Sequence, residues 1–271
     1  MHEHAIDIHE GRIRIRESGK GPALLMIHGL FVSGDVFRPI VDRLSDRFRC
    51  LAIDLPGSGR SIASLSFIPG WLSYAKAVLD TADALSLARF SLLGHSMGAG
   101  IAIVAAANAA RRVEKLVLAD AVSLPYNVPM KGRLLRVPGL GGLLFRCYGR
   151  GMFVNYFRHD VFRDPRAMDL DLVLRHYEIL SAHRTMTLAA LRITADPRPV
   201  TTAVPTVGAS SLVLWGANDR LVPPDVGRRL ADAIPGARLE IIPECGHSPL
   251  EEKPDESARI IGEFLAMRGK S

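Results

Sequence analysis

Three polar residues that lie far apart in the chain are of the types that together activate a serine hydroxyl. Ser96 stands in the segment GHSMG, Asp219 in WGANDRLVP and His247 in ECGHSPLEEKP. A serine hydroxyl is a weak nucleophile unless a base accepts its proton and a third group orients that base. These residue types therefore predict nucleophilic catalysis, with Ser96 as nucleophile, His247 as general base and acid, and Asp219 as the orienting carboxylate.

The segment around Ser96 also predicts groups that could stabilise a negatively charged intermediate. An apolar run precedes Ser96 and an alanine-rich run follows it, which is typical of a sharp strand-to-helix turn. The Met97 amide then opens a helix, where backbone N–H groups are unsatisfied and favour an anion. A second donor is expected from the loop MIHGLF, with Leu30 N–H as the best candidate. His28 and Gly29 are expected to shape that loop.

Other acidic and histidine residues compete for these roles. Asp120 ends an apolar run at 113–119 and is the rival of Asp219 as the orienting carboxylate. His95 directly precedes the nucleophile, and we expect its side chain to point away from Ser96. Asp54, in DLPGSGRS, is expected to close a turn.

A regular alternation of elements surrounds these residues. Alternating or continuous apolar runs predict strands, and apolar residues three and four apart predict helices. The expected strands lie within residues 5–8, 12–16, 23–29, 47–54, 88–94, 113–120, 210–219 and 237–247. The expected helices lie within residues 36–44, 74–87, 97–110, 224–233 and 258–266. This order predicts an α/β fold with a mostly parallel sheet and helices on both faces.

One interval interrupts the alternation. Ninety residues separate Asp120 from Ser211, more than a crossover needs, and loops of that length are rarely structureless in a compact domain. We therefore expect an inserted helical cap (a lid) at 122–205, between core segments 1–121 and 206–271.

The ordered motifs resemble those of the α/β-hydrolase superfamily, specifically its lid-bearing esterase and lipase-like branch. The resemblance runs nearly end to end, through HG at 28–29, DLPGSGRS, GHSMG, WGANDRLVP and CGHSPLEEKPDE. It implies an α/β-hydrolase fold with a helical cap. It also implies a triad of Ser96, His247 and Asp219, and oxyanion amides at Leu30 and Met97. Over the cap it extends only to length and helical character.

The net charge of +6 is concentrated in the expected cap. Residues 131–166 contain eight Lys or Arg and two Asp, which is a local excess of +6. The segment is otherwise apolar and carries no nucleic-acid motif, so a nucleic-acid partner is not expected. The favoured interpretation is an amphipathic helix pair that covers the active site and leaves its arginines in solvent. The alternative is contact with an anionic membrane or lipid surface.

The remaining composition predicts a cytoplasmic enzyme without a cofactor. The N-terminal residues are polar, and no apolar run has the length of a membrane span. Cys50, Cys147 and Cys245 have neither metal-ligand spacing nor an even number, so a disulfide framework or zinc site is not expected. Neither a metal nor a cofactor is expected.

The expected function is hydrolysis of a hydrophobic carboxylic ester through an acyl-enzyme. C–C bond hydrolases, lactonases, acyltransferases and perhydrolases on the same scaffold remain alternatives, because a fold does not fix its chemistry. A slow-turnover ligand receptor is a further alternative. A serine at position 96 argues against the dehalogenase and epoxide-hydrolase branches, which place an aspartate there.

Overall fold

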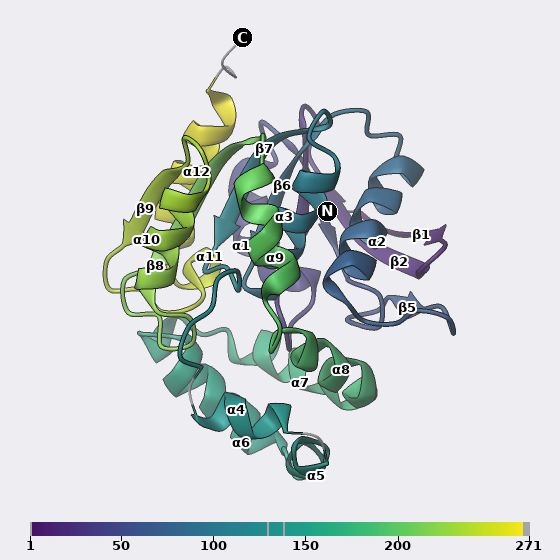
Figure 1. Cartoon of the computed structure of the whole chain (residues 1–271), viewed down its shortest axis with the longest axis vertical. Coiled ribbons are helices and arrows are strands. Elements are labelled where there is room, and N and C mark those ends of the chain that lie inside the picture. The colour runs from purple at the N-terminus through teal and green to yellow at the C-terminus, as the bar shows by residue number, and fades with distance from the viewer. Residues whose placement is uncertain (1, 129, 138, 268–271) are drawn as a thin grey trace.

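A nine-stranded sheet forms the centre of the computed structural model, which describes residues 2–128, 130–137 and 139–267 (Figure 1). Eight strands follow the order β1-β2-β4-β3-β6-β7-β8-β9, and the short β5 pairs with β2. The strands are β1 (His2–Ile8), β2 (Gly11–Ser18), β3 (Ala23–Ile27), β4 (Arg49–Ile53), β5 (Ile62–Ala63), β6 (Phe90–His95), β7 (Val113–Ala119), β8 (Ser210–Gly216) and β9 (Arg238–Ile242).

The strands from β4 to β9 along this path are parallel, whereas β1 and β2 pair antiparallel. The central strands are continuous apolar runs because both faces of a parallel sheet are covered by helices. The predicted α/β-hydrolase fold with a mostly parallel central sheet is confirmed. Parallel pairing also brings the carboxyl ends of β3, β6, β8 and β9 to one edge of the sheet.

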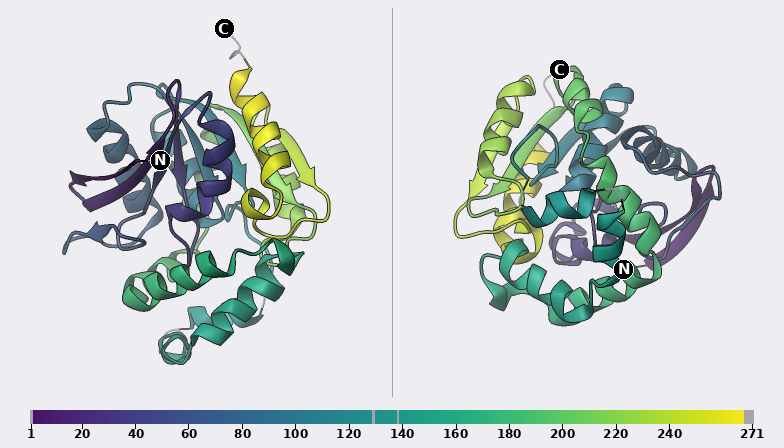
Figure 2. Two further views of the ribbon diagram at one scale, coloured as in Figure 1. Left: turned by 180° about the vertical axis from the view of Figure 1, so that it is seen from behind. Right: turned by 60° about the horizontal axis from the view of Figure 1, so that its bottom comes forward.

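Helices cover both faces of the sheet, and each face has its own apolar core (Figures 1 and 2). One core includes residues of α2, α3, α9 and α10, and the other includes residues of α1 and α12. The core helices and 3-10 turns are η1 (Gly34–Phe37), α1 (Arg38–Leu44), α2 (Trp71–Ala84), α3 (Met97–Asn108), α10 (Pro224–Ala233), α11 (Pro249–Glu252) and α12 (Pro254–Ala266).

The long insertion after β7 is helical, as predicted, and most of it lies beyond one end of the sheet (Figure 1). Its elements are α4 (Met130–Arg136), α5 (Leu140–Arg146), α6 (Arg150–Tyr156), a π turn (Phe157–Val161), η3 (Pro165–Ala167), α7 (Leu170–Ala182), α8 (Arg184–Ile193), α9 (Arg198–Ala203) and η4 (Val204–Thr206). The amphipathic helix pair predicted for the basic segment of the cap is instead three short helices, α4, α5 and α6. Gly139 and Gly149 each precede one of the new helices as its N-cap, which explains the extra breaks.

The division into segments 1–121, 122–205 and 206–271 stays a prediction. Helix α9 lies inside the predicted cap range yet packs against α3 and α2 of the core. Val200 and Val204 belong to the same apolar core as these two helices. No helix among the described residues has both the length and the apolar character needed to span a bilayer.

Candidate active site

Ser96 lies in the sharp turn between β6 and α3, where the backbone is strained. Its φ of 55° and ψ of −118° lie in a region that non-glycine residues seldom adopt. A Cβ at Gly94 would lie 2.5 Å from the Ala99 Cα, and one at Gly98 would lie 2.1 Å from the Ile27 carbonyl oxygen. Both neighbours must therefore be glycine, and the turn has the strand–turn–helix context that the sequence predicts.

The three side chains that the sequence singles out lie together. The Ser96 Oγ is 2.9 Å from His247 Nε2, and His247 Nδ1 is 2.7 Å from Asp219 Oδ2. Because a carboxylate only accepts, Nδ1 carries the imidazole proton and Nε2 is the acceptor that faces the serine hydroxyl. Ser96, Asp219 and His247 follow β6, β8 and β9, whose carboxyl ends share one edge of the sheet.

Asp219 and His247 are each held by backbone contacts of their own. Asp219 Oδ1 accepts hydrogen bonds from the amides of Leu221 at 2.8 Å and Val222 at 3.0 Å. The His247 amide donates to the carbonyl of Val161 at 2.7 Å. Both side chains are buried. The imidazole is thus fixed from its backbone and from Nδ1, and Nε2 is left for the serine.

Asp120, the rival carboxylate, lies beside the triad but is not hydrogen-bonded to His247. It follows β7 with a φ of 46°, and its Oδ1 accepts from the Gly216 amide at 2.9 Å. Complete burial raises its pKa well above the usual range, and the nearby Asp219 carboxylate raises it further. The raised pKa favours the protonated form of Asp120, and the carboxylate in contact with the imidazole is Asp219.

Asp120 and two members of the triad form the group of potential metal ligands that the described part of the chain contains. One ligand atom each from Asp120, Asp219 and His247 lies within 4.8 Å of the other two. Both imidazole nitrogens already face a hydrogen-bonding partner, and the raised pKa of Asp120 opposes the ionised form that a metal ligand takes. These features fit a hydrogen-bond network better than an ion site, and the expectation of no metal and no cofactor stays a prediction.

The two predicted oxyanion amides lie beside Ser96 and are free to donate. Leu30 and Met97 line the same cavity as Ser96. Within the described residues, neither amide has a hydrogen-bond partner. The Met97 amide also begins α3, so the positive end of that helix points toward the site. A Cβ at Gly29 would lie 3.0 Å from the Ser96 Cβ, so glycine lets this loop approach the nucleophile without crowding.

His28 holds the loop that carries Leu30. Its Nε2 accepts from the Leu55 amide at 3.0 Å, so Nδ1 carries the proton and donates to the Gly29 carbonyl at 2.7 Å. Burial lowers the pKa of His28, so the ring is neutral. These contacts join the loop to the segment after β4 and fit the predicted supporting role.

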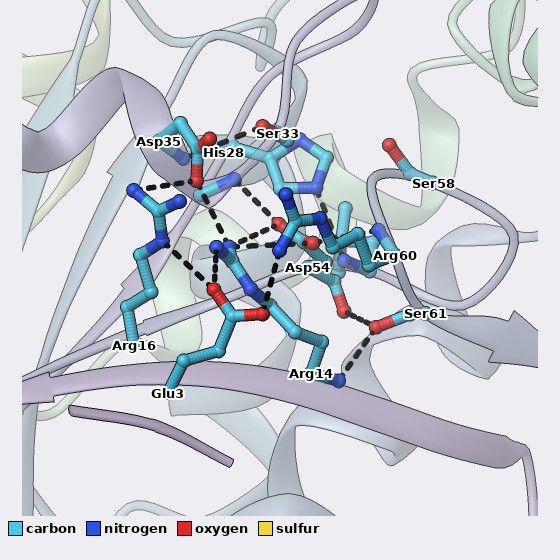
Figure 3. A network of polar contacts seen from close by, with 12 residues as sticks. Glu3, Arg14, Arg16, His28, Ser33, Asp35, Asp54, Ser58, Arg60 and Ser61 are labelled. Atoms are coloured by element: carbon cyan, nitrogen blue, oxygen red, sulfur yellow. Dashed lines mark hydrogen bonds and ion pairs between the residues drawn. The ribbon is translucent and has the colours of Figure 1, made fainter. Parts of the chain in front are cut away.

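An ionic network centred on the buried Arg14 and Asp54, which the sequence did not reveal, lies near His28 (Figure 3). Asp54 accepts from the amides of Gly34 at 2.7 Å and Arg60 at 2.8 Å, and its carboxylate lies 3.4 Å from Arg14 Nη1. Arg14 also contacts Glu3 at 2.7 Å and holds the pKa of that carboxyl at about 2. Asp54 does close a turn, as predicted. Its partner Arg14 lies 40 residues away, which no local pattern signals.

The contact between His95 and His247 is a second feature that the sequence did not reveal. As expected, its ring does not contact Ser96. Its Nε2 donates instead to the His247 carbonyl at 2.8 Å, and the two rings lie 5.2 Å apart. Burial lowers the pKa of His95 to about 3, so the ring stays uncharged. His95 thus helps to hold the backbone of His247 in place.

A cavity of about 330 Å³ opens at Ser96 and extends under the cap. Its walls are mostly apolar or aromatic, including Leu30, Phe31, Val32, Met97, Val122, Leu135, Met152, Phe157, Val161, Leu191, Leu221 and Val222. The polar side chains on its wall include Tyr126, Tyr148, Tyr156, Asn155, Asp160, Arg220 and Glu251. A cavity of this kind suits an apolar molecule with a few polar groups.

Glu251 is an unusual member of this wall. Ser248 Oγ donates to its Oε2 at 2.5 Å. Burial raises the pKa of Glu251 to about 7, and the charge of Asp169 adds to the rise, whereas the Ser248 hydrogen bond opposes it. The cavity therefore changes charge near neutral pH, which the sequence did not indicate.

A parallel sheet that bears a serine on a strained strand-to-helix turn, with Asp219 and His247 after two later strands, defines the class of α/β hydrolases. Residues 24–260 match the model of the Alpha/beta hydrolase family, and the chain belongs to that family. The family and the names of the relatives support hydrolase activity.

Relatives and solved structures with different activities resemble this chain over nearly its full length. It is 27% identical over 276 residues to 2-hydroxy-6-oxo-6-phenylhexa-2,4-dienoate hydrolase of Comamonas testosteroni, covering 97% of this chain and 94% of the relative. A thermophilic esterase from Thermogutta terrifontis superimposes with a TM-score of 0.81 at 24% identity, covering 98% of each chain. The enol-lactonase of Burkholderia xenovorans LB400 also superimposes with a TM-score of 0.81 at 24% identity, covering 97% of this chain and all of the other. These structural similarities establish the fold.

Proposed function

We propose that this chain is a serine carboxylester hydrolase that acts on hydrophobic esters. One observation carries the proposal: an unbroken hydrogen-bond chain from Ser96 through His247 to Asp219 ends in a largely apolar cavity. Two free amides, at Leu30 and Met97, lie beside the same serine. This arrangement provides a nucleophile, a base, an orienting carboxylate and oxyanion donors.

The first half-reaction forms an acyl-enzyme. Ser96 Oγ attacks the ester carbonyl carbon while its proton passes to His247 Nε2. The carbonyl oxygen becomes an oxyanion that accepts from the Leu30 and Met97 amides. His247 then donates that proton to the alcohol oxygen, the C–O bond breaks, and the alcohol leaves.

The second half-reaction repeats these transfers with water. His247 removes a proton from the water molecule, whose oxygen attacks the acyl carbon. The acyl–Ser96 bond breaks, and the proton returns to the serine oxygen. Asp219 stabilises the positive charge that the imidazole carries in both halves.

The polar groups of the cavity favour an uncharged substrate. Among the described lining residues, Arg220 is the cation, but it is exposed and its Nη1 donates to the carbonyl of His159. Two acids, Asp160 and Glu251, line the same cavity. An anionic substrate would meet the Glu251 carboxylate, which gains charge as the pH rises through about 7.

A panel of p-nitrophenyl esters from acetate to palmitate tests the proposal. Release of p-nitrophenol should be saturable, and Ser96→Ala should reduce kcat by about 10⁴-fold or more with unchanged thermal unfolding. Mass spectrometry of the quenched enzyme should show one acyl group on the peptide that contains Ser96. Retention of more than about a tenth of wild-type turnover by Ser96→Ala would refute the assignment.

C–C bond hydrolysis is the second candidate, because curated relatives carry that activity in their names. The Comamonas testosteroni relative is named for a hydroxy-oxo-dienoate, which is an anionic substrate. The same triad could act on the ketone carbonyl of such a compound. Incubation with a 2-hydroxy-6-oxodienoate, followed by its visible absorbance, discriminates the two. Turnover of the dienoate together with silence across the ester panel would favour this candidate.

A further inference from the structure

The cap carries more than half of the large hydrophobic side chains that are exposed among the described residues. Of the thirteen large hydrophobic residues exposed among the described residues, seven lie between 130 and 152: Met130, Leu134, Val137, Leu140, Leu143, Leu144 and Met152. We call these seven the cap patch. Exposed apolar residues gathered in this way mark interaction sites, whereas single ones need no explanation.

Helix α5 differs from an ordinary amphipathic helix, because its solvent-facing side is also apolar. Leu140, Leu143 and Leu144 face solvent, with Leu143 at 60% exposure, while Gly141 and Phe145 are buried. An amphipathic helix would place polar residues where these leucines stand. The helix therefore has one apolar face on the cap and a second that is uncovered.

The charge around the cap patch has one sign. Residues 130–159 contain no Asp or Glu. Arg133, Arg146 and Arg150 are exposed, and none of them pairs with a carboxylate in the described part of the chain. Leucine and methionine side chains among unpaired arginines complement a surface that has phosphate groups over hydrocarbon.

The position of the cap patch relates this surface to the candidate active site. Helices α4 and α5 lie at the end of the molecule opposite the C-terminus (Figure 1). The same segment forms part of the cavity wall, because Gly132, Leu135 and Met152 line the cavity that opens at Ser96. A surface in contact with the cap patch would thus lie beside the cavity.

We propose that the cap patch docks this protein on the surface of an anionic lipid bilayer. The exposed leucines and methionines enter the region between headgroups and acyl chains, and the arginines contact lipid phosphates. No helix crosses the membrane in this arrangement, so binding is peripheral and reversible. The apolar cavity then lies close to a reservoir of apolar substrates. This docking does not depend on the proposed ester chemistry.

Vesicle co-sedimentation of the full chain tests the docking. Ser96→Ala protein is used, so that lipid hydrolysis does not alter the vesicles. We expect binding to vesicles of phosphatidylglycerol and phosphatidylcholine, little binding to pure phosphatidylcholine, and loss of binding as salt rises. Failure to bind phosphatidylglycerol vesicles at low salt would overturn the proposal.

Two sets of variants assign the binding to this surface. Arg146→Glu with Arg150→Glu should weaken partitioning by about tenfold or more, since each basic residue near an anionic membrane contributes about fivefold. Arg111→Glu with Arg228→Glu makes the same charge change at exposed core positions and should retain most of the binding. Equal losses in the two pairs would show that net charge alone binds the vesicles, which contradicts docking by this patch.

A leucine variant separates a lipid surface from a nucleic acid or other polyanion. Leu140→Ser with Leu143→Ser should weaken vesicle binding and leave retention on a heparin column unchanged. Leu65→Ser with Ile68→Ser, at exposed positions before α2, is the matched control and should bind vesicles normally. Normal vesicle binding by the α5 pair would refute the apolar part of the docking. None of these residues lines the cavity, so the same four pairs made in the enzyme that retains Ser96 should leave turnover of a soluble p-nitrophenyl ester unchanged.

Discussion

The two buried carboxyls beside His247 differ in their hydrogen bonds, and this difference separates their roles. Asp219 contacts the imidazole and accepts two backbone amides, whereas Asp120, whose pKa is raised by burial, accepts at Oδ1 from the Gly216 amide and is not hydrogen-bonded to the imidazole. An asparagine at position 120 keeps an acceptor for that amide and leaves the hydrogen bond between Asp219 and His247 in place. An asparagine at position 219 removes the carboxylate that stabilises the imidazolium.

We therefore expect the two isosteric substitutions to have very different effects. Asp219→Asn should lower kcat by about 10⁴-fold, and Asp120→Asn should leave kcat within about tenfold of wild type. Steady-state kinetics on a p-nitrophenyl ester measures both, and thermal unfolding confirms that both variants fold. A comparable loss of kcat in Asp120→Asn would mean that Asp120 is ionised and shares the orienting role.

Glu251 should make stability depend on pH in a direction opposite to that of most carboxyls. Its pKa in the folded protein is about 7, above the ordinary value of 4.5, so the folded state holds the proton more tightly than the unfolded state. Its contribution to stability is therefore present below about pH 4.5 and is lost as the pH rises through 7. Glu251→Gln removes the titration and keeps the shape of the side chain.

Urea unfolding of wild type and Glu251→Gln at pH 5 and pH 8 measures this effect. Relative to wild type, the unfolding free energy of the variant should rise by about 1–2 kcal/mol from pH 5 to pH 8. This figure allows for the partial exposure of the Glu251 side chain. The neighbouring Glu252 accepts backbone amides of Gly246 and Asp164, so it is no suitable control. Glu256 on α12, which is partly exposed, is a suitable control, and Glu256→Gln should show no such gain. A pH-independent difference for Glu251→Gln would contradict the raised pKa.

At the residue scale, the site separates into what local sequence reveals and what it does not. Ser96 and His247 were predictable because each stands in a short motif with glycines. Such glycines indicate a strained backbone or a close approach between two chain segments. Asp219 could be proposed but not separated from Asp120, because both end a strand. The contact of His95 with the His247 carbonyl spans 152 residues. Only the packing of β6 against the loop after β9 creates it.

At the scale of elements, the core was predictable because each strand and helix has its own apolar period. The predicted helix 224–233 coincides with α10. The two-residue strand β5 is too short to show a period, and its pairing with β2 depends on the fold around it. The cap was predicted only as a helical insertion. Two of its short helices begin directly after a glycine, and aromatic contacts that a linear pattern does not encode hold them.

The turn between β6 and α3 should tolerate no side chain at Gly98. Its Cβ would overlap the carbonyl oxygen of Ile27 on β3, so α3 would have to move away from the sheet. Gly98→Ala should cost about 1–3 kcal/mol or more of unfolding free energy and should displace the Met97 amide from Ser96. The unfolding free energy, measured by chemical denaturation, and kcat should therefore both fall.

Gly151→Ala is the matched control. No heavy atom lies within 4 Å of a Cβ at Gly151, and this residue lies inside helix α6. Alanine there should be neutral or stabilise by up to about 1 kcal/mol. An equal response of the two variants would show that the Ile27 contact does not determine the requirement for glycine at position 98.

At the scale of the whole molecule, Phe31 connects the cap to the loop that carries the Leu30 amide. Its φ of 69° turns the chain sharply after Leu30. Its ring lies 5.9 Å from Tyr156 and 6.1 Å from Phe145, both on the cap. Aromatic pairs at such distances are attractive beyond their buried area. The cap therefore helps to hold the oxyanion loop as well as to enclose the cavity.

Phe31→Ala should consequently impair catalysis more than it impairs folding. Loss of the ring frees the Leu30 amide to move, and removal of one oxyanion donor lowers kcat by about 10²- to 10³-fold in serine hydrolases, so a partial loss of about 10- to 100-fold is expected. Steady-state kinetics with p-nitrophenyl acetate measures kcat, because so small an acyl group needs little of the cavity. Phe67→Ala removes an aromatic ring that packs on Tyr74 of α2 and controls for general destabilisation. If both variants keep wild-type kcat, then the core alone positions the oxyanion loop, and the cap acts only as a cover.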